Sequence, residues 1–152
     1  MSYLTQKTIK NNVSCSGIAL HSGLDVNICI KPAEPNYGIV FKRVDIKENN
    51  LVYPNFMNVT NTSLNTTIEN EFGFKVSTIE HLMGALFGLG IDNALIEIDN
   101  EEVPILDGSE TEFIEKSLNS GLVMSEAPIK MIKSNKKIKY IDGDRCISIE
   151  HY

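Results

Sequence analysis

A glutamate beside a histidine, Glu80-His81, is the pair of residues in this sequence best suited to metal-assisted hydrolysis. An imidazole can hold a divalent metal ion, and an adjacent carboxylate can accept a proton from water that the metal polarises. His81 is therefore predicted to be a metal ligand or a proton carrier, or else only a hydrogen-bonded interface residue. Glu80 also has a structural interpretation, because Ser77 and Glu80 have the spacing of a helix-capping box, as do Ser109 and Glu112.

The sequence offers few further ligands for such a metal. Catalytic zinc typically has three protein ligands and one open position. The remaining histidines, His21 and His151, do not have ligand spacing to His81. If a metal binds at His81, the other ligands must come from carboxylates of this chain, from His21 brought near by the fold, or from polypeptide outside this sequence.

Three loops supply weaker candidates. His21 lies between Gly17 and Gly23, which permit tight turns or close approach of a ligand, so it either lines a site or bonds to a loop carbonyl. The run 60–67 has no titratable group, so any role would depend on hydroxyls, amides and main chain. The segment 104–109 is predicted to be a structural connection, with a catalytic Asp107 as the less favoured alternative.

A helix that begins at Ser77 is expected to position Glu80 and His81. Its apolar face is predicted to consist of Ile79, Leu82, Met83, Leu86 and Phe87, and Gly90 should end it. The opposite face then holds His81, Gly84, Ala85 and Gly88. Glycine on an exposed helix face costs about 1 kcal/mol relative to alanine. We therefore expect another element to pack closely there, with His81 in the crevice between them.

The rest of the chain predicts an α+β fold. Strand-like segments, separated by Gly, Pro, Asn and Asp clusters, cover residues 3–15, 24–31, 38–46, 51–60, 64–69 and 93–99. A second helix is expected to start at Ser109 and to be closed by Gly121, with Phe113, Ile114, Ser117 and Leu118 buried. Its outer face is expected to hold Glu110, Glu112, Glu115 and Lys116. The expected architecture is a two-layer sandwich in which a mostly antiparallel sheet carries two helices on one face.

The first domain is expected to span residues 1–125, with a linker at 124–128. Strand-like runs follow at 129–133, 136–141 and 145–150, with a turn at Asp142-Gly143-Asp144. Strands with no helix to cover them do not make a stable domain in water. Residues 126–152 therefore either extend the first unit or, as we predict, are the opening strands of an incomplete second domain.

Composition excludes several classes of protein. The 14 basic residues are outnumbered by 20 acidic ones, so the formal charge of -6 opposes binding to nucleic acid. The longest uncharged apolar segment, 82–91, falls short of the roughly 20 residues that span a bilayer, so no transmembrane segment is predicted. Three cysteines without zinc or redox spacing, and no secretory signal, favour a reduced, cytoplasmic protein.

Four blocks carry a resemblance to a known family. They are GIALHSG at 17–23, VSTIEHL at 76–82, GLGIDN at 88–93 and EVPILDGS at 102–109. In this order they resemble the UDP-3-O-acyl-N-acetylglucosamine deacetylases, zinc amidases of lipid A biosynthesis. The resemblance covers nearly the whole chain and implies two domains of like architecture, each a sheet with two helices, with the active site between them.

The resemblance also implies roles for individual residues. His81 matches the zinc ligand of the first domain, and Glu80 the general base that activates zinc-bound water. The implied substrate is a UDP-linked acylated amino sugar, whose N-acetyl group leaves as acetate. Leu64 and Asn65 match a stretch that lines the catalytic cleft, although Asn65 stands where a cysteine is common, and His21 is expected to contribute to substrate binding.

The resemblance places the other zinc ligands in a His-Lys-x-x-Asp motif of the second domain, which this sequence lacks. One imidazole does not hold a catalytic zinc with useful affinity, so the chain alone is expected to be inactive and to need the missing C-terminal domain or a second chain. Its uncovered apolar surface should favour aggregation or self-association. The alternative is a non-catalytic binding or scaffolding domain that kept the fold and lost the chemistry.

Overall fold

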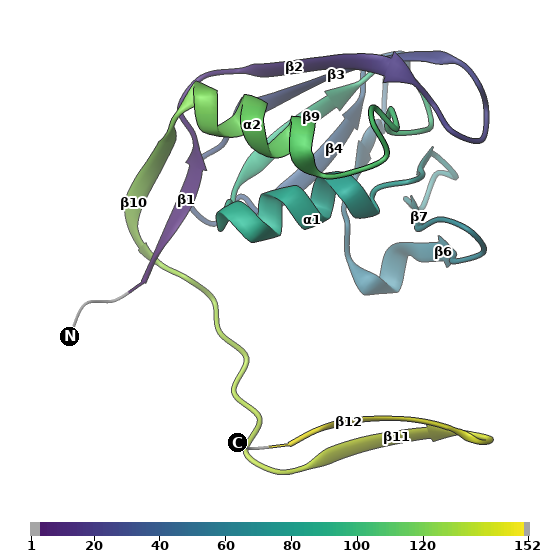
Figure 1. Ribbon diagram of the computed structural model, residues 1–152, viewed down its shortest axis with the longest axis vertical. Coiled ribbons are helices and arrows are strands. Elements are labelled where there is room, and N and C mark those ends of the chain that lie inside the picture. The colour runs from purple at the N-terminus through teal and green to yellow at the C-terminus, as the bar shows by residue number, and fades with distance from the viewer. Residues whose placement is uncertain (1–3, 151–152) are drawn as a thin grey trace.

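A five-stranded sheet forms the centre of the computed structural model, which describes residues 4–150 (Figure 1). Its strand order is β2-β3-β9-β4-β5. The strands are β2 (Val13–Ile18), β3 (Asp25–Pro32), β4 (Ile39–Arg43), β5 (Leu51–Val52) and β9 (Ala94–Ile98). Neighbouring strands are antiparallel except for β4 and β9, which are parallel. The mostly antiparallel sheet is as predicted.

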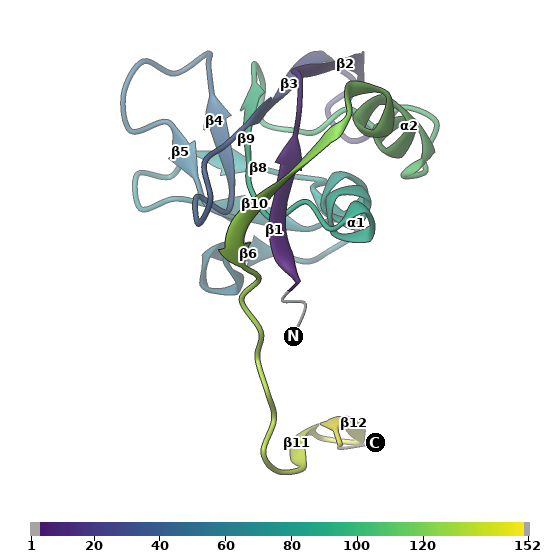
Figure 2. The same ribbon diagram turned by 90° about the vertical axis from the view of Figure 1, so that its left-hand side faces the viewer.

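Two helices, α1 (Glu80–Leu89) and α2 (Thr111–Ser120), lie side by side on one face of this sheet (Figure 2). Residues of β9 alternate between buried and half-buried because successive side chains point to opposite faces. The core lies between the sheet and the helices, and it includes Ile28, Ile30, Ile96, Leu82, Leu86 and Phe113. The predicted α+β class, with two helices on one side of a sheet, is confirmed.

The start of α1 is reached through a smaller, three-stranded sheet. A short 3-10 helix, η1 (Phe56–Asn58), leads into β6 (Val59–Asn61), which pairs with β7 (Thr67–Glu69), and β7 pairs with β8 (Lys75–Val76). The loop between β6 and β7 carries Leu64 and Asn65. Because β8 ends only a few residues before α1, this sheet holds the loop beside the N-terminus of the helix.

The first strand and the expected linker differ from the prediction. The expected strand 3–15, whose first residue lies outside the described part of the chain, is divided by a turn into β1 (Thr5–Ile9) and β2. The expected linker 124–128 is instead part of β10 (Leu122–Pro128), which pairs antiparallel with β1. Ile9 lies opposite Leu122, so the pairing joins segments that are far apart in sequence.

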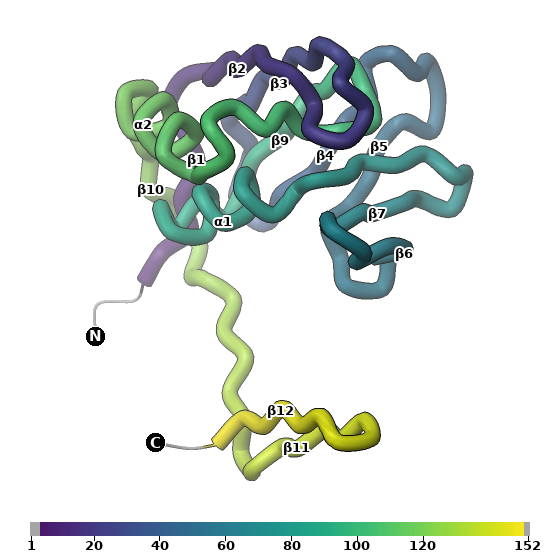
Figure 3. The backbone as a smooth tube through the Cα atoms, turned by 45° about the vertical axis from the view of Figure 1, so that its right-hand side comes forward, coloured from purple at the N-terminus to yellow at the C-terminus, as the bar shows by residue number. Residues whose placement is uncertain are grey.

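The last strands form a hairpin, β11 (Ile138–Asp142) and β12 (Arg145–Ile149), joined at Gly143. The predicted turn at Asp142-Gly143-Asp144 is confirmed, whereas 129–133 is not a strand. Every residue of the hairpin is exposed, and Figure 3 shows it apart from the rest of the chain. The division into two domains stays a prediction.

Helix α1 ends as predicted but begins later and faces differently. Gly90 is its C-cap, with a φ of 68°, whereas the helix starts at Glu80 and not at Ser77. Phe87, expected in the core, is 88% exposed, and Ala85, expected on the outer face, is buried. The buried face of the helix is centred on Leu82 and Ala85 and is rotated from the predicted apolar face. Phe87, at the edge of the predicted face, therefore points to solvent.

Helix α2 likewise starts later than predicted, at Thr111, but it ends as predicted, with Gly121 as its C-cap. Phe113 and Ser117 are buried as expected, but Leu118 is 53% exposed. In the part of the chain that the structure describes, no helix has the length and apolar character needed to cross a membrane.

Candidate active site

Glu80 and the loop between β6 and β7 meet at the start of α1. The backbone N–H of Thr66 donates a hydrogen bond to Glu80 Oε2 at 3.0 Å. Thr66 directly follows Leu64 and Asn65, so this bond brings the loop predicted to line a cleft next to the predicted base. The Glu80 side chain is half-buried, which leaves its carboxylate in reach of a ligand.

The loop is held in a strained conformation. Leu64 has a φ of 63° and is 88% exposed. A left-handed conformation costs a non-glycine residue about 1–2 kcal/mol, and such strain is concentrated at functional sites. Asn65 is half-buried, and its Oδ1 accepts a hydrogen bond from Thr67 Oγ1 at 3.1 Å. Asn65 and Thr67 also line a polar groove of ≈ 480 Å³ that extends to Ser77.

The predicted capping boxes are wrong. The residues that precede the two helices directly are Ile79 and Glu110, and neither makes a side-chain capping bond. Ser77 is instead paired with the segment that precedes Val103: its N–H donates to the Glu101 carbonyl at 2.8 Å, and its carbonyl accepts from the Val103 N–H at 3.0 Å. Ser77 therefore does not cap the helix, and Glu80 does not bond back to it. The Glu80 carboxylate accepts the N–H of Thr66 instead.

The connection before α2 is a turn, as predicted. Asp107 Oδ1 accepts the N–H of Ser109 at 3.0 Å, and Ser109 Oγ accepts the N–H of Thr111 at 3.1 Å. Glu112, expected to complete the second capping box, instead has Oε2 3.7 Å from Lys116 Nζ. Asp107 therefore acts here as a turn-forming residue.

His81 lies one residue into α1, next to Glu110 at the start of α2. Its side chain is 30% exposed, yet Nδ1 is buried and has no hydrogen-bond partner among residues 4–150. Glu110 Oε1 lies 3.5 Å from this nitrogen, close enough for an ion pair but without hydrogen-bond alignment. The exposed part of the ring therefore belongs to its other atoms.

The predicted close approach to the small-residue face occurs at only one of its glycines. A Cβ placed on Gly84 would lie 3.5 Å from Cγ of Glu110, so the side chain of the residue directly before α2 packs there. A Cβ on Gly88 would meet no described atom within 4 Å. Glu110 thus packs on this face near His81, while the face at Gly88 is open.

His21 is connected to the same end of the molecule through Glu102. The N–H groups of His21 and Ser22 each donate to the Glu102 carboxylate at 2.9 Å, and Thr78 Oγ1 donates to it at 3.0 Å. His21 itself is exposed, and its ring makes no hydrogen bond to a loop carbonyl within the described chain. Because Thr78 precedes Glu80 closely, Glu102 fixes the His21 turn relative to the predicted base.

Opposing effects act on the ionisation of the buried Glu102. Burial by itself would raise the pKa of this carboxyl, but hydrogen bonds from the His21 and Ser22 backbone and from Thr78 outweigh burial and lower the pKa below its ordinary value. Thr78 is buried with a φ of 54°, a rare conformation for a β-branched residue. The ionised carboxylate therefore holds a strained residue two positions before the first residue of the helix.

The donor set for a metal is incomplete in the described residues. Within 4–150 no three His, Cys, Asp or Glu side chains lie together in a way that could hold a metal ion, and His151 is outside this range. His81 nevertheless fits one ligand position, because an imidazole whose Nδ1 is buried can present Nε2 outward. Carboxylates of this chain and His21 do not complete the site.

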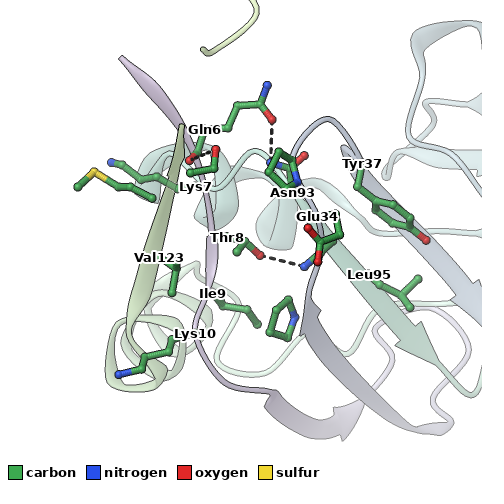
Figure 4. A pocket seen from close by; sticks show the side chains of 15 residues that line it. Gln6, Lys7, Thr8, Ile9, Lys10, Glu34, Tyr37, Asn93, Leu95 and Val123 are labelled. Carbon is green, nitrogen blue, oxygen red and sulfur yellow. Dashed lines mark hydrogen bonds between the residues drawn. The ribbon is translucent and has the colours of Figure 1, made fainter. Parts of the chain in front are cut away.

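A second groove, of ≈ 560 Å³, lies between the β1–β10 pair and the loop after β3 (Figure 4). Its walls are tied by hydrogen bonds from the Ala33 N–H to Thr8 Oγ1 at 3.1 Å and from Asn93 Nδ2 to Gln6 Oε1 at 3.0 Å. None of the predicted site residues lines it. The candidate active site is therefore the cluster around Glu80 and His81.

Comparison with known proteins decides the family. Residues 6–152 match the family model described as LpxC, UDP-3-O-acyl N-acetylglycosamine deacetylase. This chain belongs to that deacetylase family. It is 44% identical over 142 residues to the UDP-3-O-acyl-N-acetylglucosamine deacetylase of Pseudoalteromonas atlantica and 39% identical over 149 residues to that of Actinobacillus succinogenes. These alignments cover 93% and 98% of the chain but 47% and 49% of the relatives.

A third deacetylase, from Shewanella violacea, is 41% identical over 147 residues, which are 97% of the chain and 48% of that relative. The chain thus spans about half the length of the curated relatives that it matches. The resemblance drawn from the four sequence blocks is confirmed at the level of the family.

Proposed function

We propose that this chain is the first half of a zinc-dependent amide hydrolase that removes the N-acetyl group from UDP-3-O-acyl-N-acetylglucosamine in lipid A biosynthesis. The names of the relatives support the reaction class and the substrate. The observation that carries the proposal is the Thr66–Glu80 hydrogen bond, because it joins the predicted base to the loop of Leu64 and Asn65 directly beside His81.

Each residue has a role in this proposal. Zinc, when bound, supplies a Lewis acid that polarises the amide carbonyl and water. His81 would hold the metal as one ligand through Nε2. Glu80 accepts a proton on its carboxylate as water attacks the N-acetyl carbon, and the Thr66 N–H keeps one carboxylate oxygen oriented during this transfer. The carbon–nitrogen bond then breaks as the nitrogen takes up the proton that Glu80 accepted, which gives acetate and a free amine.

Leu64, Asn65 and His21 are proposed to contact the substrate. Asn65 borders a polar groove, and its neighbour Thr66 bonds to Glu80. The His21 turn is fixed to the segment before α1 through Glu102. These contacts are assigned by position: Leu64 is exposed at the loop tip, and His21 has a free, exposed ring.

The chain alone is proposed to be inactive. With a single imidazole in this chain, the remaining metal ligands must come from protein outside this sequence. Even the loss of a residue that only hydrogen-bonds a metal ligand lowers metal affinity on the order of 10- to 100-fold. Activity should therefore require the C-terminal domain, or a second chain that supplies its residues.

Zinc titration with measurement of acetate release tests the proposal. The chain is compared with a version extended at its C-terminus to the length of the relatives. We expect turnover only in the extended protein, and its loss in both Glu80→Gln and His81→Ala. Glu112→Gln, a change in α2 away from the site, should leave turnover intact. Turnover that survives both site changes would reject the assignment, and no turnover in the extended protein would favour a binding or scaffolding domain.

A further inference from the structure

The buried nitrogen of His81 has one acidic neighbour. Nδ1 is inaccessible to solvent, and Oε1 of Glu110 lies 3.5 Å away. Glu110 directly precedes α2 and is 48% exposed, so its carboxylate contacts the imidazole while part of it stays in water. Sequence reasoning placed Glu110 on the outer face of the second helix, where it would not reach His81.

The path of the Glu110 side chain explains why a small residue is found one turn after His81. A Cβ on Gly84 would lie 3.5 Å from Glu110 Cγ and 3.6 Å from Oε1, which is ordinary contact. A side chain longer than alanine that pointed toward Glu110 would compete with the carboxylate for this space. Gly84 therefore leaves room for Glu110 to lie across α1 and reach Nδ1.

The chemistry of this contact is specific for one form of the ring. A neutral imidazole carries one N–H, on either Nδ1 or Nε2, and the other nitrogen accepts. An ionised carboxylate has no hydrogen to donate, so it favours the form in which Nδ1 carries the proton. In water the other form, with the proton on Nε2, predominates. Only the Nδ1–H form leaves the Nε2 lone pair free for a metal ion.

We propose that Glu110 is a positioning residue that holds His81 as the Nδ1–H tautomer and so keeps Nε2 available as a ligand atom. The 3.5 Å contact is longer than the roughly 2.7–3.2 Å of an N–H···O hydrogen bond, so the two side chains must move closer for Nδ1 to donate to the carboxylate. The importance of this tautomer for catalysis rests on the function proposed above. The tautomer itself does not, because it is a property of the metal-free chain.

Two-bond ¹H–¹⁵N correlation NMR of this chain without added metal, at about pH 9, where histidines are ordinarily neutral, tests the proposal. We expect the Nδ1–H pattern for His81 and a shift toward Nε2–H in Glu110→Ala. Glu112→Ala is the matched control, because it removes the same charge two residues further along the chain, where the carboxylate lies near Lys116, and it should change nothing. The exposed ring of His21 is an internal reference.

Two results would overturn the proposal. One is an Nε2–H pattern for His81 in the unchanged chain, which needs no variant and therefore no assumption that a variant folds. The other is an unchanged His81 pattern in Glu110→Ala with the amide spectrum of the folded chain retained. Neither result depends on turnover, so a failure of the proposed function would be seen separately in the acetate assay.

Discussion

The hydroxyl of Thr78 donates to the buried carboxylate of Glu102 at 3.0 Å, two residues before the first residue of the helix that carries the candidate site. The same carboxylate accepts the N–H groups of His21 and Ser22. Three segments distant in sequence thus meet at one side chain. Since Thr78 has a φ of 54°, Glu102 also stabilises a conformation that threonine rarely adopts.

Replacement of Glu102 by glutamine should destabilise the fold. A glutamine has only one acceptor oxygen. Its NH₂ group would face one of the two backbone N–H donors, and that donor would lose its acceptor. A buried donor left unpaired costs about 1–3 kcal/mol, and we expect the free energy of unfolding to fall by that amount in urea denaturation. Glu101→Gln is the control, because the Glu101 side chain is 68% exposed, and it should change stability by less than about 0.5 kcal/mol.

The contribution of Glu102 should depend on pH with a defined sign. Its pKa is lowered in the folded chain, so the stabilisation is present above the pKa of the unfolded state, about 4.3, and is lost as pH falls through the folded pKa. The difference in unfolding free energy between the chain and Glu102→Gln should be largest near pH 7 and shrink below about pH 4.3.

Other carboxyls do not obscure this measurement. A hydrogen bond from Lys31 lowers the pKa of Glu97, but Glu97 is the same in both proteins and its effect cancels in the difference. Denaturation of both proteins between neutral and acid pH provides the data. A difference that stayed constant down to about pH 3 would show that the effect of Glu102 does not come from its charge.

The sequence predicted those parts of the site that depend on local chemistry. Gly90 ends α1 because a left-handed C-cap needs glycine, and the Glu80-His81 pair is recognisable from residue type alone. The start of α1 was missed because Ser77 pairs with the Glu101–Val103 segment, a contact that no local pattern shows. Likewise β10 resembled a linker because its partner, β1, lies at the other end of the domain.

The groups that connect the site were beyond sequence reasoning for physical reasons. Thr66 acts through its backbone N–H, which every residue but proline carries, so its side chain gives no signal. Glu110 is not on the outer face of α2 as counted, because it precedes the helix and turns toward Gly84. Glu102 gave no signal, because a glutamate is ordinarily exposed, whereas Glu102 is buried among hydrogen-bond donors from other segments.

Two glycines of the same region should respond to alanine in opposite ways. Gly90 has a φ of 68°, where alanine costs about 1–2 kcal/mol, so Gly90→Ala should lower the free energy of unfolding by that amount. Gly88 lies within α1 and has no described atom near its missing Cβ, so Gly88→Ala should raise stability by up to about 1 kcal/mol. Thermal unfolding followed by circular dichroism measures both. The reverse order of the two variants would contradict the assigned ends of α1.

Phe87 should make this chain associate with itself. It is 88% exposed on α1, on the open side of the helix next to Gly88, and burial of such a side chain is worth about 1.5–3 kcal/mol to any surface that covers it. Sedimentation velocity over a range of concentrations should detect association of the chain, and Phe87→Ser should weaken it. The change should leave the free energy of unfolding within about 0.5 kcal/mol, because an exposed side chain adds little to the core. If the chain remained monomeric at all concentrations, or if Phe87→Ser associated equally well, the open face of α1 would not be the associating surface.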